Sequence, residues 1–596
     1  MLNGRLYRTG LVPVVFALAI AAFSLASHPR PLTAHLAPDA FQGTRALNEL
    51  NTLAAAYPDR RPGSPGDQRL AAAIEHTLER LGGTAGGGFS VQTHQLSGQT
   101  IDGSRSLSTV VATRPGSTSE RPVVILAHRD AAARGSRAEL SGTAALLELA
   151  RVFASRQTRR TIVLVSTSGG SGGAAGAAAF AAGLAAPLDA AIVLGDVAGT
   201  RLAPPLVVPF SDGYGSAPAQ LQRTVTDAFK REAGLNPGSP SAIGQVAHLS
   251  FPFAVGEQGR LQEAGVPSVL VQLSGERGPT AGEAVSAERL EGSGRAVLNA
   301  VDALDAAPDI SSQPETGVVL QRKTLPAWAV QLVLGALLFA PLLVAVDGLA
   351  RARRRRLYPG RWVLWTLSCA LPFLACAAFA YLLGALGILR AAPPTPVAPG
   401  ALPFDGGAAA ALVSVLLVFA LAWLQWHAFV RRRRWSARPD PEVAGLSMLL
   451  VLLAAAIVVW AVDPFAALLL IPALHIWLLL AAPELRPRPL AALGLVAAGL
   501  LPLALLILFY AHQLGLGPAT IAWAALLLVA GGHVGLPAAI VWCVGLGCAA
   551  VAVMLSVTEP PPPRGPSTDD FEITIRGPMS YAGPGSLGGT ESALRR

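Results

Sequence analysis

VVILAHRD, residues 123–130, joins an uninterrupted apolar run to three polar residues. The run Val123–Ala127 has the pattern of a strand that is buried on both faces. His128, Arg129 and Asp130 follow it directly. In open α/β sheets, binding and chemistry take place beyond the carboxyl ends of the strands. Residues that follow similar apolar runs elsewhere in the chain are therefore candidates for the same site.

Three further apolar runs have the same character, at Thr161–Ser166, Ala190–Gly195 and Pro267–Leu273. Helical patterns lie between the runs, at Gly142–Phe153 and Ala174–Leu184. Strands that alternate with helices predict a mostly parallel sheet covered by helices on both faces.

Polar or small residues follow each of the other runs. They are the glycine-rich Thr167–Gly173, Asp196, and Ser274–Glu276. Together with His128 and Asp130 they place one histidine and two aspartates at one predicted edge of the sheet. This combination indicates a metal site, although a single His-x-Asp pair also serves simply to orient a loop.

By composition, the chain divides into five segments. Residues 1–10 form a predicted cytoplasmic N-terminus, and residues 11–27 a signal anchor or first transmembrane helix, with a cleavable signal peptide as the alternative. Residues 28–322 form an exported domain, 323–557 a transmembrane domain of about eight helices, and 558–596 a disordered tail. The eight apolar segments lie near 326–348, 361–386, 407–428, 443–462, 464–482, 489–511, 518–535 and 537–556.

The composition of the 596 residues supports a membrane protein. They are 52% hydrophobic and 14% charged, against roughly 25% charged in a typical soluble domain. The net charge of +9 comes with arginine clusters beside apolar segments, which set membrane orientation and do not indicate nucleic-acid binding. The clusters predict a multi-pass protein of the cell membrane, with residues 28–322 on the extracytoplasmic side and the lipid bilayer as a partner. The clusters are Arg5 and Arg8, Arg351–Arg356, Arg431–Arg434, and Arg486 with Arg488.

The cysteines and the histidines of the apolar segments indicate little about function. All four cysteines lie in apolar segments, so residues 28–322 have neither a disulfide framework nor a cysteine-ligated metal site. Histidines in the apolar segments, such as His475, are the usual pointers to a transport path, but they are also found as hydrogen-bonded interior residues. A transporter-like protein is our third functional hypothesis.

The ordered segments of residues 28–322 resemble the co-catalytic-zinc aminopeptidases of metallopeptidase family twenty-eight. The resemblance implies a three-layer α/β fold with a zinc site at the sheet edge identified above. The matching segments are RRPGSPGDQRLAAAIEHTLERLG (60–82), VVILAHRD (123–130), LSGTAALLELARVF (140–153), RTIVLVS (160–166), AAIVLGDVAG (190–199) and EAGVPSVLVQL (263–273).

Three positions keep the family's residue type. The resemblance implies that His128 is the first zinc-binding histidine, that Asp130 supports it, and that Asp196 is the aspartate that binds one zinc only. These residues could hold at most one zinc ion, weakly. The alternative interpretation is that they are structural residues inherited from an active ancestor.

At the other family positions, different residues replace the expected ligands and base. Ala138 stands where the resemblance places the aspartate that bridges both metals, and Gly170 and Ser171 stand where it places the catalytic base and a zinc ligand. The family's Ser-Asp-His becomes Gly256-Glu257-Gln258, so Gln258 replaces a histidine. Residues 274–282, where the last zinc-binding histidine is expected, contain none.

These losses predict a catalytically inactive domain, because a two-zinc hydrolase needs a bridging carboxylate, further ligands and a base for the attacking water. We expect a pseudoenzyme without catalytic residues and without a bound cofactor. Its role would be binding or scaffolding, with a peptide or a membrane protein as a further candidate partner. The alternative is an active zinc exopeptidase in which Glu139, Glu257 or Glu276 substitutes for the missing ligands.

A second motif indicates a different chemistry. Gly169–Gly173 matches the Gly-x-Ser-x-Gly turn of serine hydrolases, and Asp196 or Asp212 with His248 would complete the order Ser–Asp–His. Backbone N–H groups of the same loop could instead bind phosphate. The glycine content makes either match weak, and we favour a loop of small residues.

Overall fold

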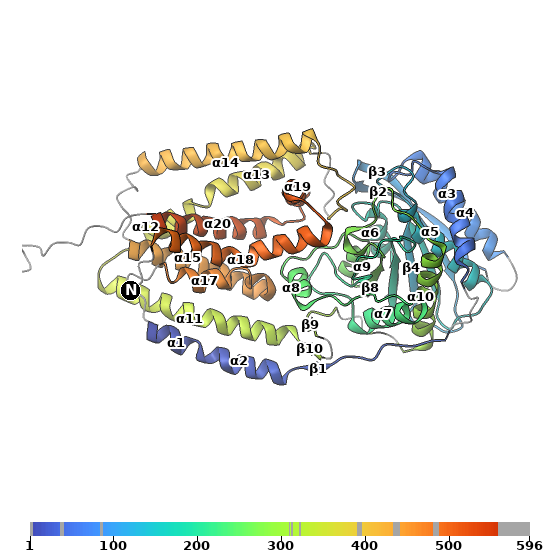
Figure 1. Ribbon diagram of the computed structural model, residues 1–596, viewed down its shortest axis with the longest axis horizontal. Helices are drawn as coiled ribbons and strands as arrows, with labels where there is room; N and C mark the ends of the chain where they lie inside the picture. Colours follow the sequence, from blue (N-terminus) through green and yellow to red (C-terminus); the bar gives the residue numbers. More distant parts are fainter. Residues whose placement is uncertain are drawn as a thin grey trace, which may run out of the picture.

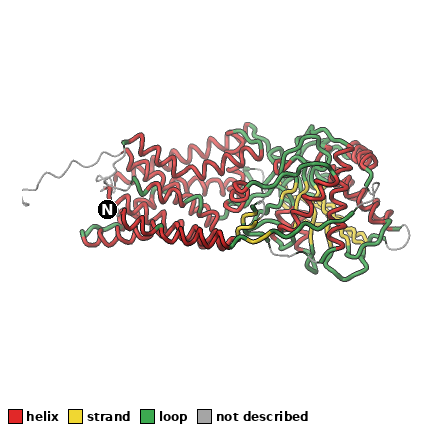
Figure 2. The backbone as a smooth tube through the Cα atoms, turned by 60° about the horizontal axis from the view of Figure 1, so that its bottom comes forward, coloured by secondary structure: helices red, strands yellow, loops and turns green. Residues whose placement is uncertain are grey.

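The structure is a computed structural model that describes residues 4–35, 41–83, 88–308, 310, 314–320, 323–389, 396–432, 441–480 and 488–557. It consists of an α/β domain and a bundle of long helices, and the domain lies at one end of the bundle (Figure 1). Figure 2 shows most of the strands inside the α/β domain and the long helices side by side in the bundle. The predicted tail, 558–596, lies outside the described residues.

A seven-stranded sheet with the order β2-β3-β5-β4-β6-β8-β7 forms the centre of the α/β domain. The four apolar runs are its central strands, as predicted, and all three pairings among them are parallel. The outer strands pair antiparallel, so the sheet is mixed. The strands are β2 (Ser90–Thr100), β3 (Gly103–Arg114), β4 (Val123–His128), β5 (Ile162–Thr167), β6 (Ala190–Leu194), β7 (Val207–Val208) and β8 (Ser268–Val271).

Helices cover both faces of the sheet, which gives the expected three layers. Alternate side chains of β4 show this arrangement: Val123 and Ile125 belong to one apolar cluster, and Val124 and Leu126 to another. The first cluster includes α3 (Gly43–Ala56), α4 (Pro65–Gly82), α5 (Arg137–Ala154), α7 (Ala219–Glu232) and α10 (Ala287–Ala306). The second includes α6 (Ala175–Ala182) and α9 (Gln258–Glu263).

The buried Arg129 fixes the end of β4. Its guanidinium forms an ion pair with Asp67 of α4 at 2.8 Å, and both side chains are fully buried. It also donates to the backbone oxygens of Ser108 at 2.8 Å and Ser166 at 3.1 Å. Because Arg129 stands between His128 and Asp130, these bonds hold both candidate site residues in place.

The bundle includes seven described helices that are long and apolar enough to cross a membrane. The predicted spans at 464–482 and 518–535 correspond to shorter apolar helices, Pro464–Trp477 and Pro518–Ala530. The helix Pro464–Trp477 is divided into α16 (Pro464–Ala467) and α17 (Ile471–Trp477). The other short helix, α19 (Pro518–Ala530), is followed by two glycines. The long ones are α1 (Gly4–Gly10) with α2 (Val12–Phe23), α11 (Ala327–Arg354), α12 (Gly360–Ser368) with α13 (Leu371–Ala385), α14 (Gly406–Arg432), α15 (Pro441–Val462), α18 (Pro489–Leu514) and α20 (Leu536–Val557).

The arginine-bearing helix ends lie at one end of the bundle. α11 ends with Arg351, Arg353 and Arg354, and α14 ends with Arg431 and Arg432. Both ends lie far from the α/β domain, as do the start of α1 and the end of α20 (Figure 1). Inside the bundle, His475 of α17 forms a hydrogen bond with Tyr7 of α1 at 2.7 Å.

A small sheet and a hydrogen bond are among the contacts that join the α/β domain to the bundle. A small sheet, β1 (Ala26–Ser27), β10 (Lys323–Leu325) and β9 (Val318–Val319), brings together the points where the chain enters and leaves the domain (Figure 2). Beyond α8 (Ala242–Ser250), the Phe251 backbone oxygen accepts a hydrogen bond from Tyr510 of α18 at 2.8 Å.

We predict that Arg129→Met destabilises the α/β domain by about 3–5 kcal/mol, because it leaves the buried Asp67 carboxylate without its ion-pair partner. Urea unfolding of the full-length protein in detergent, followed by pulse proteolysis, measures the loss. Arg134→Met is the matched control, since Arg134 is exposed in the next loop. Equal stabilities of the two variants would contradict the role given to Arg129.

Candidate functional site

A pocket at the carboxyl ends of the central strands contains the candidate site. It measures about 470 Å³ including its open mouth. His128 at the end of β4 and the loop after β5 contribute to it, and Ala398, from the segment between α13 and α14, closes one side. The lining residues are His128, Glu139, Gly170, Ser171, Val193, Gly195, Val255, Gly256, Glu257, Leu270, Gln272, Gly278, Pro279 and Ala398.

Asp130 holds the glycine-rich loop in place. Its carboxylate accepts hydrogen bonds from the backbone N–H groups of Gly170 and Ser171, both at 3.0 Å, and from the Ser171 hydroxyl at 2.5 Å. Burial opposes ionisation of Asp130, but His128 and the Ser171 hydrogen bonds outweigh it and lower the pKa to about 2. Asp130 is therefore an ionised anchor for this loop.

His128 lies against the same carboxylate. Its Nδ1 is 3.1 Å from the Asp130 backbone oxygen and 3.7 Å from the nearer carboxylate oxygen. Burial lowers the pKa of His128, but the hydrogen bond and charge of Asp130, with the charges of Glu257 and Glu139, raise it to about 9. The imidazole is therefore held as a cation at neutral pH.

Asp196 caps the turn that follows β6. Its Oδ1 accepts from the backbone N–H groups of Gly199 at 2.7 Å and Ala198 at 3.2 Å. Burial raises its pKa to about 6 against these bonds. Asp196 does not line the pocket that His128 lines, so the predicted pair do not share it.

The loop after β5 packs directly on His128. A Cβ atom at Gly170 would lie 2.3 Å from the His128 Cβ and 2.5 Å from its Cγ. A side chain at position 170 would therefore overlap His128, and a glutamate does not fit without movement of the loop. The His128 imidazole fills the space that a side chain at position 170 would need.

Ala138 and Gln258, two further positions that the resemblance singles out, are buried. Ala138 is 1% exposed in the first turn of α5. Gln258 is fully buried at the start of α9, and its Nε2 donates to the Phe210 backbone oxygen at 3.3 Å. Both side chains are interior residues outside the pocket lining.

Residues 109–244 match the family model of Peptidase family M28. This interval includes β4, α5, β5 and β6, and with them His128, Asp130 and Asp196. The α/β domain is M28-peptidase-like. The match ends before Glu257.

Solved structures with similar folds are zinc-dependent peptidases and glutaminyl cyclases. The glutaminyl cyclase of Porphyromonas gingivalis is 15% identical, with 44% of this chain and 99% of that chain covered and a TM-score of 0.31. The glutaminyl cyclase of Fimbriiglobus ruber is 18% identical, with 46% and 99% covered and a TM-score of 0.33. The aminopeptidase of Aneurinibacillus sp. strain AM-1 is 13% identical, with 46% and 96% covered and a TM-score of 0.33. No curated protein matches the chain.

Two of the three suggested substitute carboxylates do line the pocket of the M28-like domain. Glu257 is 1% exposed, and its Oε1 accepts from the Thr167 hydroxyl at 2.6 Å. Burial raises the pKa of Glu257 to about 7 against the pull of His128, and burial also raises the pKa of Glu139. The Oε2 atoms of Glu257 and Glu139 are buried without a hydrogen-bond partner in the described structure. Glu276 is instead paired with His248 at 3.0 Å.

The donors do not fit the zinc pair that the family implies. Within the described ranges, no three His, Cys, Asp or Glu side chains come together closely enough to hold a metal ion. Ala138, where the resemblance places the bridging carboxylate, offers only a methyl group, and the Asp130 oxygens are already bonded to the loop. We therefore assign no metal chemistry to these residues.

The structure gives the residues of the serine-hydrolase alternative separate partners. Ser171 donates to Asp130, His248 contacts Glu276, and Asp212 accepts from the Ala254 N–H at 2.8 Å. Phosphate binding is also unsupported, because the loop's N–H groups are used internally. Besides the two donated to Asp130, those of Gly172 and Ala174 bond to the Gly169 oxygen.

We predict a pH-dependent stability change at Asp212, whose pKa burial raises to about 7 with help from the charge of Glu263. Between the unfolded pKa near 4 and the folded value, only the folded state keeps this proton, so its contribution to stability is lost as pH rises from about 4 to 7. Asp212→Asn removes the titrating carboxyl group and keeps a side-chain oxygen that accepts the Ala254 N–H.

The apparent melting temperature of Asp212→Asn minus that of the wild type should be larger at pH 8 than at pH 4. We expect an increase of roughly 2–4 °C or more. Thermal scans of the full-length protein in detergent measure both values. Asp227→Asn, in α7 on the domain surface, is the control. An Asp212→Asn difference that is the same at both pH values would contradict the assignment.

Proposed function

We propose that this protein is an integral membrane protein whose M28-like domain binds a ligand or partner and does not hydrolyse peptides. The close packing of Gly170 on His128 is the observation that carries the proposal. At 2.3 Å from the His128 Cβ, a side chain at position 170 has no room. The path of the loop, and not only the residue type at position 170, therefore excludes a glutamate there.

The chemistry of hydrolysis supports this interpretation. A two-zinc peptidase needs a bridging carboxylate and a base that takes a proton from water. Here Ala138 and Gly170 occupy these positions, and the Asp130 carboxylate holds the loop. His128 and Asp196 are, in this proposal, structural remnants that bind zinc weakly or not at all.

The placement of the pocket supports a role linked to the bundle. Ala398, from a segment of the bundle, lines the pocket, and Val397 lies 3.2 Å from the position of a Cβ at Gly172. The sheet edge that would receive a peptide thus faces the bundle. A ligand that reaches the pocket along the bundle, or a scaffold that couples domain and bundle, suits this arrangement.

An active zinc exopeptidase is the second candidate. The observation in its favour is that Glu139 and Glu257 line the same pocket as His128 and each keeps one unpartnered oxygen. Both side chains would have to move upon metal binding to become ligands, because among the described residues no three His, Cys, Asp or Glu side chains are grouped closely enough.

We predict that the purified full-length protein, dialysed against zinc and then washed, retains well under one zinc per chain and releases no amino acids from peptides. Elemental analysis and an amino-acid release assay measure the two quantities. His128→Ala should change neither, and Arg134→Ala is the control. One or two tightly held zinc ions that His128→Ala removes, together with peptide hydrolysis, would establish the exopeptidase instead.

The arrangement of the helices supports a multi-pass topology in the cell membrane with the M28-like domain, residues 28–322, on the extracytoplasmic side. Arginine-rich helix ends remain in the cytoplasm during insertion. In this protein they lie at the end of the bundle away from the M28-like domain (Figure 1). The end of α20 would then be cytoplasmic as well.

We predict that Ser119→Cys reacts with a membrane-impermeant maleimide in sealed right-side-out vesicles, and that Arg431→Cys reacts only after the vesicles are opened. Ser119 is exposed in the M28-like domain, and Arg431 is exposed at the opposite end of the bundle. The unmodified protein, whose cysteines are buried or partly buried, gives the background. The reverse pattern of labelling would place the domain in the cytoplasm.

A further inference from the structure

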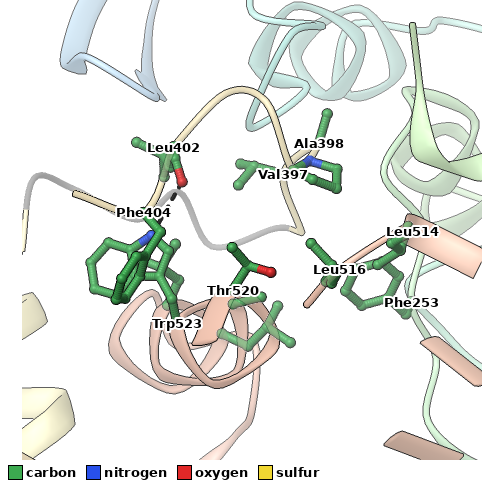
Figure 3. Close-up of a pocket in the computed structure, with 13 residues that line it drawn as sticks. Phe253, Val397, Ala398, Leu402, Phe404, Leu514, Leu516, Thr520 and Trp523 are labelled. Carbon is green, nitrogen blue, oxygen red and sulfur yellow. Dashed lines mark hydrogen bonds between the residues drawn. The ribbon is translucent and has the colours of Figure 1, made fainter. Parts of the chain in front are cut away.

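A second, apolar pocket lies between the M28-like domain and the bundle. It measures about 580 Å³ including its open mouth. Phe253 of the domain lies on one side, α19 with Trp523 on another, and the segment after α13 covers it (Figure 3). A hydrogen bond of 3.1 Å from the Trp523 indole N–H to the Leu402 backbone oxygen ties that segment to α19. The lining residues are Phe253, Val397, Ala398, Pro399, Leu402, Phe404, Leu514, Leu516, Thr520, Trp523, Ala524, Leu527 and Leu528.

The apolar pocket and the polar pocket at the sheet edge are neighbours. Ala398 lines both of them. Residues 253–257 also run from one to the other, because Phe253 lines the apolar pocket and Val255, Gly256 and Glu257 line the polar one. The two pockets therefore share two walls, and a methyl side chain stands where they meet.

The polar pocket has unsatisfied acceptors. Glu257 is 1% exposed, its Oε2 has no hydrogen-bond partner in the described part of the chain, and the same holds for the Oε2 of Glu139. A buried carboxylate oxygen without a donor is costly. A protonated amine brings three N–H donors and a positive charge, which is the chemistry that such carboxylate oxygens accept. His128 lines the same pocket, but its imidazole is paired with Asp130, so an anionic head group would still meet the two glutamates.

We infer that the two pockets together bind an amphiphile with a protonated amine head group and a single apolar chain. The amine contacts Glu257 and Glu139 in the polar pocket, and the chain passes Ala398 into the apolar pocket between Phe253 and Trp523. The inference rests on the proposed function in one respect: the pocket is used for binding, without hydrolysis.

Octylamine, octanol, octanoate and butylamine are suitable probes, because they separate the charge of the head group from the length of the chain. Full-length protein in nanodiscs is titrated by calorimetry, with empty nanodiscs subtracted for partition into lipid. We expect octylamine to bind about tenfold or more tightly than octanol, and octanoate to bind least. Butylamine should bind far more weakly than octylamine, because each methylene buried is worth roughly a three- to fourfold gain.

Two variants locate the ligand. Glu257→Gln should weaken octylamine binding about tenfold and leave octanol unchanged. Ala398→Phe should weaken both, since it fills the junction of the pockets. Glu288→Gln, an exposed glutamate in the first turn of α10, should change neither. Melting temperatures identify any variant that does not fold, and the wild-type comparison of the four probes stands without the variants.

Equal binding of octylamine and octanol by the wild type, or no binding above empty nanodiscs, would overturn the inference. So would a folded Glu257→Gln variant that binds octylamine as the wild type does. If amine binding fails while zinc retention and peptide hydrolysis are also absent, the proposed function stands and only the ligand class is wrong. Peptide hydrolysis with bound zinc would refute the proposed function, whatever the amine result.

Discussion

The hydrogen bonds of the Asp130 carboxylate organise the whole sheet edge. Asp130 accepts two backbone N–H groups and one hydroxyl from Gly170 and Ser171, and its charge holds His128 beside it. These bonds bring the loop after β5 down onto the imidazole. An ionised carboxylate that accepts several bonds in a buried site stabilises its partners strongly. The shape of the pocket follows, since the loop and His128 form one side of it.

The central strands were predictable because each is a short apolar run, and burial on both faces requires such a run. The β2–β3 hairpin was not predicted, because β2 is largely polar and alternates between exposed and partly buried positions. The segments at 464–482 and 518–535 are apolar throughout, so composition alone predicts helices as long as the other spans. Only the break between α16 and α17 and the glycines after α19 limit their length.

The candidate site was predictable only in part. Family spacing identified the positions of His128, Asp130 and Asp196, yet it could not show that Asp196 stands outside the pocket that His128 lines. The contact of Gly170 with His128 depends on the path of a loop with seven small residues, which sequence spacing does not determine. Glu139 and Glu257 were named as substitutes, but Glu276 was indistinguishable from them until its pairing with His248 was seen.

The unpartnered Oε2 atoms of Glu257 and Glu139 lie in a pocket that the bundle borders. In a hydrolase, carboxylates at this edge would be neutralised by metal ions. Here burial raises the pKa of Glu257 to about 7, so near neutral pH a proton or a bound cation must take over that role. The bundle supplies the apolar wall next to these carboxylates through Ala398. A site that keeps acidic oxygens and borders an apolar pocket is suited to hold a cationic amphiphile, and the packing of Gly170 on His128 leaves no room there for a glutamate base.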